Sequence, residues 1–74
     1  MIGASIVDLS QVGFGCPDLL VGFRKRNFLI EIKNPATYGK LSADQNDFFD
    51  NWRGEVLVAR ASTHLIAELT RKTL

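Results

Sequence analysis

Two short apolar runs separated by a basic turn form the clearest pattern of hydrophobic and polar positions in the chain. The first run covers residues 19–23 (LLVGF), the second covers 27–30 (NFLI), and residues 24–26 between them are all basic. Each run has the length and composition of a β-strand, and the polar break is typical of a hairpin turn. We therefore predict a pair of antiparallel strands.

Side-chain alternation predicts that this hairpin has one mixed face and one apolar face. Opposed residues on antiparallel strands share a face, so a loop with an even number of residues separates the two kinds of side chain. One face then carries Asp18, Leu20, Glu31 and Lys33. The other face is wholly apolar and consists of Leu19, Val21, Phe23, Phe28, Ile30 and Ile32. An odd loop would bury Asp18 among isoleucines, so hydrophobic burial favours the even loop.

Two even loops remain open as alternatives. A two-residue loop of Lys25 and Arg26 places Asp18 opposite Lys33, although tight turns prefer Asn-Gly or Asp-Gly. A four-residue loop over 24–27 keeps the same parity. Either loop brings the charged side chains of the mixed face close together.

Weaker patterns predict the remaining elements. They are a strand over 4–9, a loop over 34–41, a helix from Ser42 to about Trp52, a strand over 55–61, and a last helix with Ser62 or Thr63 as its N-cap. A strand, helix, strand succession ordinarily makes a parallel pair with a right-handed crossover. The sequence therefore predicts a single α/β domain over residues 1–74, with a mixed four-stranded sheet and the order β-β-β-α-β-α.

The predicted helix after Ser42 turns a polar residue toward the sheet. Ser42 followed three residues later by Gln45 matches a capping box. Gln45 also shares a helical stripe with Phe48 and Trp52, and these aromatic residues, with Phe49, are predicted to lie in the core. Two roles stay open for Gln45, because it can serve as a capping residue or as part of a functional site.

The loop over 10–16 contains two glycines and the single cysteine of the chain. Gly13 and Gly15 permit backbone angles closed to other residues and a close approach by another backbone. Cys16 has no evident base nearby, so it is predicted to be a small filler and not a nucleophile. A lone cysteine, no signal peptide and no apolar run of membrane-spanning length together favour a cytoplasmic location.

Size and charge narrow the function only slightly. In a domain of 74 residues a single core yields about 3–5 kcal/mol, so self-association or a missing segment is an open alternative. The net charge of +1 neither demands nor excludes a nucleic-acid partner. The basic run 24–26 is predicted to be a solvated turn, with Lys40 or Arg60 as candidates for a DNA track, and His64 is predicted to lie on the surface.

The charged residues of the mixed face form a candidate site for metal-dependent chemistry. Asp18 and Glu31 offer hard oxygen ligands suited to Mg²⁺, which typically takes one or two carboxylates and leaves its other positions to water and phosphate. Lys33 shares a face with Glu31 at a spacing of roughly 7 Å, from where its ammonium can reach an attacking water or a phosphate oxygen. The alternative is a solvated strand face, which the surrounding apolar pattern disfavours.

These residues resemble the PD-(D/E)xK nuclease superfamily, and within it the virus-type replication-repair nuclease (VRR-Nuc) domains of small phage and bacterial proteins. The resemblance covers most of the chain, from about Ala4 to the last helix. It rests on GCPD at 15–18, EIK at 31–33, LSADQ at 41–45 and WRG at 52–54.

The resemblance implies metal-dependent hydrolysis of DNA phosphodiester bonds with Mg²⁺, or with Mn²⁺ as a substitute. It implies that Asp18, Glu31 and the main-chain carbonyl of Ile32 bind the metal, that Lys33 assists the attacking water and that Gln45 supports the site. Stand-alone nucleases of this kind are similar to Holliday-junction resolvases. They act as homodimers on branched DNA, in a bacterial cell or a phage-infected host.

The sequence departs from the family pattern ahead of the first strand. Family members usually have a helix there, often with a glutamate that completes the site, whereas the only acid before Asp18 in this chain is Asp8. A truncated chain, a partner subunit over the exposed sheet face, and impaired activity are three open explanations. The rival function is a catalytically weak nucleic-acid-binding or dimerisation module that retains the nuclease fold.

Overall fold

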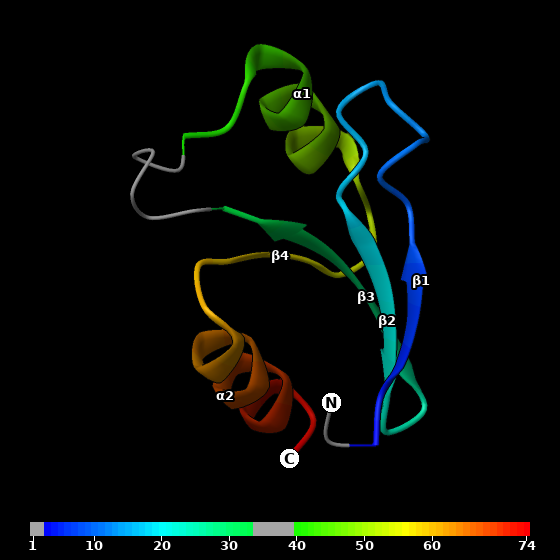
Figure 1. Cartoon of the computed structure of the whole chain (residues 1–74), viewed down its shortest axis with the longest axis vertical. Coiled ribbons are helices and arrows are strands. Elements are labelled where there is room, and N and C mark those ends of the chain that lie inside the picture. Colours follow the sequence, from blue (N-terminus) through cyan, green and yellow to red (C-terminus); the bar gives the residue numbers. More distant parts are fainter. Residues whose placement is uncertain (1–2, 34–39) are drawn as a thin grey trace.

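A computed structural model describes residues 3–33 and 40–74 and shows an α/β fold (Figure 1). The elements in chain order are β1 (Ser5–Asp8), β2 (Leu19–Phe23), β3 (Arg26–Ile32), α1 (Ala43–Asn51), β4 (Val56–Ala59) and α2 (Ser62–Lys72). The sheet has four strands in the order β1-β2-β3-β4, with the β1–β2 and β2–β3 pairs antiparallel and the β3–β4 pair parallel. The predicted class, element order and mixed sheet are confirmed, while residues 34–39 of the predicted loop lie outside the described residues.

α2 covers one face of the sheet and encloses the main core with it (Figure 1). The buried members of this core are Val21, Phe23, Phe28, Ile30, Ala59, Leu65 and Leu69. Val21, Phe23, Phe28 and Ile30 among them belong to the predicted apolar face of the hairpin, and Leu19 packs against the core as well. Ile32, at the end of β3, is 47% exposed and does not join the core. Burial against α2 therefore fixes which face of the hairpin is apolar.

The hairpin turns at Arg24 and Lys25, one residue earlier than the predicted two-residue loop and in the first half of the predicted four-residue loop. Both residues adopt positive φ, 50° and 68°, in the two-residue kind of turn that matches the twist of the flanking strands. Phe23 consequently pairs with Arg26, which belongs to β3 and not to the loop. The predicted parity is correct, but the predicted pairing is wrong by two residues.

Contacts of the basic side chains explain the position of this turn. Arg26 forms an ion pair with Glu55 and donates a hydrogen bond to the carbonyl of Lys72, so it ties β3 to the end of α2. Arg24 lies over the ring of Phe23, 4.9 Å from its centroid. The prediction of a solvated basic turn is therefore confirmed for the exposed Arg24 and Lys25, but it is wrong for Arg26, which is half-buried and belongs to β3.

α1 is less deeply packed than the sequence predicts. Phe48 and Phe49 are half-buried and Trp52 is 46% exposed, so the prediction that all three lie in the core is wrong. The reason is the position of α1, which lies at one end of the sheet beside the 9–18 loop instead of across its middle (Figure 1). The N-cap of α2 is Ala61, one residue before the earlier of the two predicted caps, and it forms no side-chain capping bond.

None of the helices in the described part of the chain combines the length and apolar character that a membrane span requires.

Candidate active site

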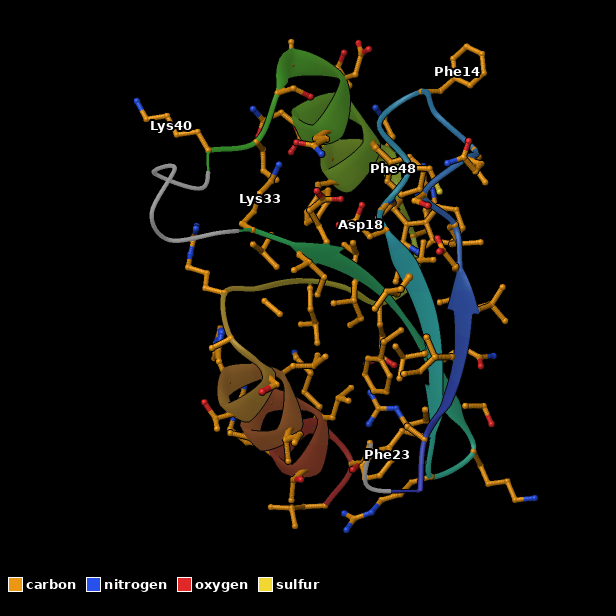
Figure 2. The ribbon with its side chains drawn as sticks, in the orientation of Figure 1. Phe14, Asp18, Phe23, Lys33, Lys40 and Phe48 are labelled. Atoms are coloured by element: carbon orange, nitrogen blue, oxygen red, sulfur yellow. The ribbon has the colours of Figure 1, made fainter. Side chains whose placement is uncertain are left out.

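The candidate site lies where β2 begins and β3 ends, beneath α1 (Figure 2). Leu19 pairs with Ile30, and the same register carries Asp18 to the position opposite Glu31. Strand alternation places Lys33 on the same face as Glu31. The predicted pairing of Asp18 with Lys33 is thus wrong. Glu31 and Lys33 lie together as predicted, and the register of the hairpin places Asp18 on the same face as Glu31.

Glu31 is the buried centre of this group. Its exposed fraction is 3%, its Oε2 accepts a hydrogen bond from Gln45 Nε2 at 2.8 Å, and the same oxygen lies 3.3 Å from Lys33 Nζ. Its other oxygen, Oε1, is buried and has no hydrogen-bond partner among the described residues. Leaving a buried acceptor unsatisfied costs about 1–3 kcal/mol, and more for a charged group. Such an atom in a native protein calls for an explanation, and a catalytic role or a bound ion is among those that apply.

Lys33 and Gln45 hold each other in place beside Glu31. Lys33 Nζ donates to Gln45 Oε1 at 2.8 Å, and the lysine side chain is only 17% exposed. Gln45 Oε1 also accepts a hydrogen bond from Ser42 N, while Ser42 Oγ accepts one from Gln45 N, so the predicted capping box is confirmed. The capping role predicted for Gln45 is therefore confirmed, and the same side chain also contacts Lys33 and Glu31.

Replacing Ser42 by alanine is expected to lower the free energy of unfolding by about 1 kcal/mol, because Gln45 N loses its acceptor. Chemical denaturation followed by circular dichroism measures this change. Ser62→Ala is the matched control, since no side chain caps α2, and its effect should stay within about 0.5 kcal/mol. An equal loss in both variants would show that the cap contributes nothing.

The carboxylate of Asp18 is oriented by the backbone of β3. Its Oδ2 accepts a hydrogen bond from Ile32 N at 2.9 Å, and the Asp18 carbonyl accepts one from Leu9 N at 2.7 Å. Pro17, just before it, is fully buried and anchors the start of β2. The side chain of Ile32 belongs to the opposite face, so the main chain of this residue is the part that meets the site.

The thiol of Cys16 lies near the carboxylates of the site, which affect its pKa. Burial raises the pKa of its thiol, and the carboxylates of Glu31 and Asp18 raise that pKa further. The thiol therefore stays protonated near neutral pH, which fits a small filler better than a nucleophile.

Gly15 sets the distance between the loop that precedes Asp18 and the start of α1. Its φ is +76°, and a Cβ at this position would lie 2.3 Å from the carbonyl oxygen of Asp44. Gly15 therefore needs both properties predicted for the loop glycines, a left-handed backbone and a close approach by another backbone. Gly13 needs only the left-handed backbone. The contact with Asp44 was not foreseen, although the glycine two residues before Pro17 was the available signal.

The donor set fits a hard divalent cation. No group of three or more His, Cys, Asp and Glu side chains in residues 3–33 and 40–74 has the arrangement of a metal site. Asp18 and Glu31 together supply two carboxylates, which matches the small number of protein ligands that Mg²⁺ usually takes. The unpaired Oε1 of Glu31 is an oxygen that the described protein groups do not use. A structural zinc site, with four Cys and His ligands, does not fit these residues.

Comparison of the chain with family models, curated proteins and solved structures finds no match. The class that the structure defines is an α/β domain with a mixed four-stranded sheet and a carboxylate, carboxylate, ammonium group at its end. The resemblance to VRR-Nuc nucleases rests on the residues of this chain alone and stays a prediction.

Proposed function

We propose that this protein is a metal-dependent endonuclease that hydrolyses DNA phosphodiester bonds, with branched DNA as the candidate substrate. The observation that carries the proposal is the buried Oε1 of Glu31, which has no hydrogen-bond partner within residues 3–33 and 40–74 and lies beside Lys33. Mg²⁺, or Mn²⁺ in its place, would be held by the two carboxylates and the carbonyl of Ile32. When bound, the cation would stabilise charge on the phosphate oxygens and lower the pKa of water.

The residues of the chain itself supply positioning and charge. Lys33 Nζ is held between Gln45 Oε1 and Glu31 Oε2, so the ammonium is fixed before any substrate arrives. From there it can donate to the attacking water or to a phosphate oxygen that gains charge. Because Glu31 is almost fully buried, these interactions act in a medium of lower polarity than water and are stronger for it.

A cleavage assay with and without Mg²⁺ tests the proposal on a linear duplex and a four-way junction. We expect hydrolysis only with Mg²⁺. Asp18→Asn keeps an acceptor for Ile32 N but removes a charge, so half-maximal cleavage should require about tenfold more Mg²⁺, or about 1.4 kcal/mol. Asp50→Asn, on the exposed side of α1, is the control and should leave the requirement unchanged. Failure of the wild-type protein to cut either DNA would refute the nuclease.

The second candidate is a catalytically weak nucleic-acid-binding or dimerisation module. The observation that favours it is β1, an edge strand on which Ile6 is 49% exposed and Val7 is 53% exposed. Exposed apolar edge strands are prone to pair with another chain, as a homodimer would require. A stable dimer in sedimentation, combined with no cleavage, would favour this second function.

A further inference from the structure

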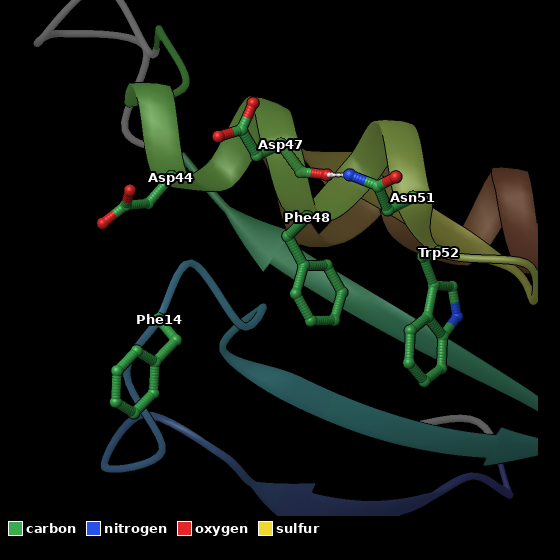
Figure 3. A pocket seen from close by; sticks show the side chains of 6 residues that line it. All are labelled: Phe14, Asp44, Asp47, Phe48, Asn51 and Trp52. Atoms are coloured by element: carbon green, nitrogen blue, oxygen red, sulfur yellow. Dashed lines mark hydrogen bonds between the residues drawn. The ribbon is translucent and has the colours of Figure 1, made fainter.

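A groove separate from the Glu31 site lies between α1 and the 9–18 loop (Figure 3). Its volume is about 430 Å³, and its walls are formed by Phe14, Asp44, Asp47, Phe48, Asn51 and Trp52. Gln45 reaches from the same helix to Glu31, whereas the groove residues of α1 line the side toward the loop. The groove is therefore not part of the proposed nuclease site.

Phe14 is presented to solvent by a strained loop. The side chain is 94% exposed, and the residue adopts a positive φ of 57° between two glycines that are also left-handed. Bulky residues rarely adopt this conformation, and such strain clusters at active sites and ligand clamps. The positive φ of Phe14 costs conformational free energy, and the exposed side chain makes too few contacts within the protein to offset that cost.

The floor of the groove is aromatic and half open. Phe48 and Trp52 stack with their ring centroids 5.2 Å apart, and Trp52 is 46% exposed (Figure 3). With Phe14 they bring three aromatic side chains from two segments around one opening. Exposed aromatic surface of this kind is typical of protein interfaces, where such rings act as anchors.

The negative charge of the groove favours a basic protein segment over nucleic acid as its partner. Asp44 and Asp47 lie on its walls, and none of the described residues that line it is basic. α1 as a whole carries three aspartates and no lysine or arginine. Negative charge repels the phosphates of nucleic acid and attracts lysine and arginine, so this surface is suited to a cationic partner.

From these observations we infer that the groove binds a protein segment in which an apolar or aromatic anchor is flanked by lysine or arginine. The anchor inserts between Phe14 and the stacked pair of Phe48 and Trp52. The flanking basic groups pair with Asp44 and Asp47. This binding requires no metal and no cleavage, so it stands or falls independently of the proposed nuclease.

Fluorescence anisotropy with short labelled peptides tests the inference on the whole chain without metal. The probe has leucine and tryptophan anchors flanked by lysines, and the comparison probes replace the lysines by glutamate or the anchors by serine. We expect binding of the first probe only. Phe14→Ser and Asp47→Asn should each raise its Kd about tenfold. Asp50→Asn, on the same helix but outside the groove, is the matched control and should leave the Kd unchanged.

Four results would overturn the inference. They are no binding of the lysine-flanked probe, equal binding of the serine probe, an unchanged Kd in Phe14→Ser, and preferential binding of labelled single-stranded DNA to the groove. Sedimentation of the same samples tests a fifth contradicting result. If the wild-type protein is a dimer and Phe14→Ser is a monomer, the groove binds a second copy of this chain. Circular dichroism confirms that each variant is folded. Because Phe14 is almost fully exposed, we expect Phe14→Ser to leave the fold intact.

Discussion

Replacing Lys33 by methionine is expected to lower the rate of Mg²⁺-dependent DNA hydrolysis by roughly 10²- to 10³-fold, the usual cost of removing one donor to developing charge. Lys33 Nζ lies 3.3 Å from Glu31 Oε2, and Gln45 Oε1 fixes its position. Methionine keeps much of the length of the side chain but cannot donate a hydrogen bond. Single-turnover rates at saturating DNA and Mg²⁺ measure the chemical step directly.

Lys25→Met is the matched control for this prediction. Lys25 lies exposed at the tip of the hairpin, at the far end of β3 from Lys33, so its loss removes the same charge from the protein without touching the site. We expect it to weaken DNA binding slightly, with a smaller dependence on salt, and to leave the saturated rate unchanged. If Lys33→Met cleaves saturating DNA at the wild-type rate, the ammonium takes no part in the reaction.

Substitution of Gly15 by alanine is expected to lower the free energy of unfolding by about 3 kcal/mol. Adopting the left-handed conformation costs a residue with a Cβ about 1–2 kcal/mol, and forcing a methyl group into packed backbone costs about 1–3 kcal/mol. Both costs apply here, because φ is +76° and the new Cβ would lie 2.3 Å from the Asp44 carbonyl oxygen. A small domain with about 3–5 kcal/mol in total would be left largely unfolded or would lose the contact with α1.

Gly13→Ala separates the two contributions. Gly13 has a φ of +78°, but none of the described residues lies within 4 Å of the position that its Cβ would occupy. Only the conformational cost applies, so we expect a loss of about 1–2 kcal/mol in urea denaturation. A loss in Gly15→Ala no larger than that in Gly13→Ala would mean that α1 moves away freely.

The faces of the hairpin could be predicted from the sequence, but the pairing of its strands could not. Alternation is a local property, and burying Val21, Phe28 and Ile30 leaves one choice of parity. The position of the turn depends on Arg26, whose partners lie in distant parts of the chain, at Glu55 and Lys72. A pattern along one strand carries no information on such contacts, which explains the error of two residues.

The members of the site were predictable for the same local reasons, whereas its environment was not. Strand spacing unites Glu31 with Lys33, and the capping box orients Gln45. The near-complete burial of Glu31 depends on how closely α1 approaches the sheet, and helical periodicity does not reveal that distance. The same limit explains the wrong prediction for Trp52, whose stripe was identified but whose packing was not.

The side-chain oxygen of Gln45 couples the first turn of α1 to the position of the Lys33 ammonium group. Gln45 Oε1 accepts from both Ser42 N and Lys33 Nζ, so the first turn of α1 and the lysine share an acceptor. Helix ends open more easily than the strands of a core. Fraying of this turn would leave Lys33 with Glu31 as its partner while the sheet and α2 stay folded, so the proposed nuclease would lose activity at a lower temperature than the protein unfolds.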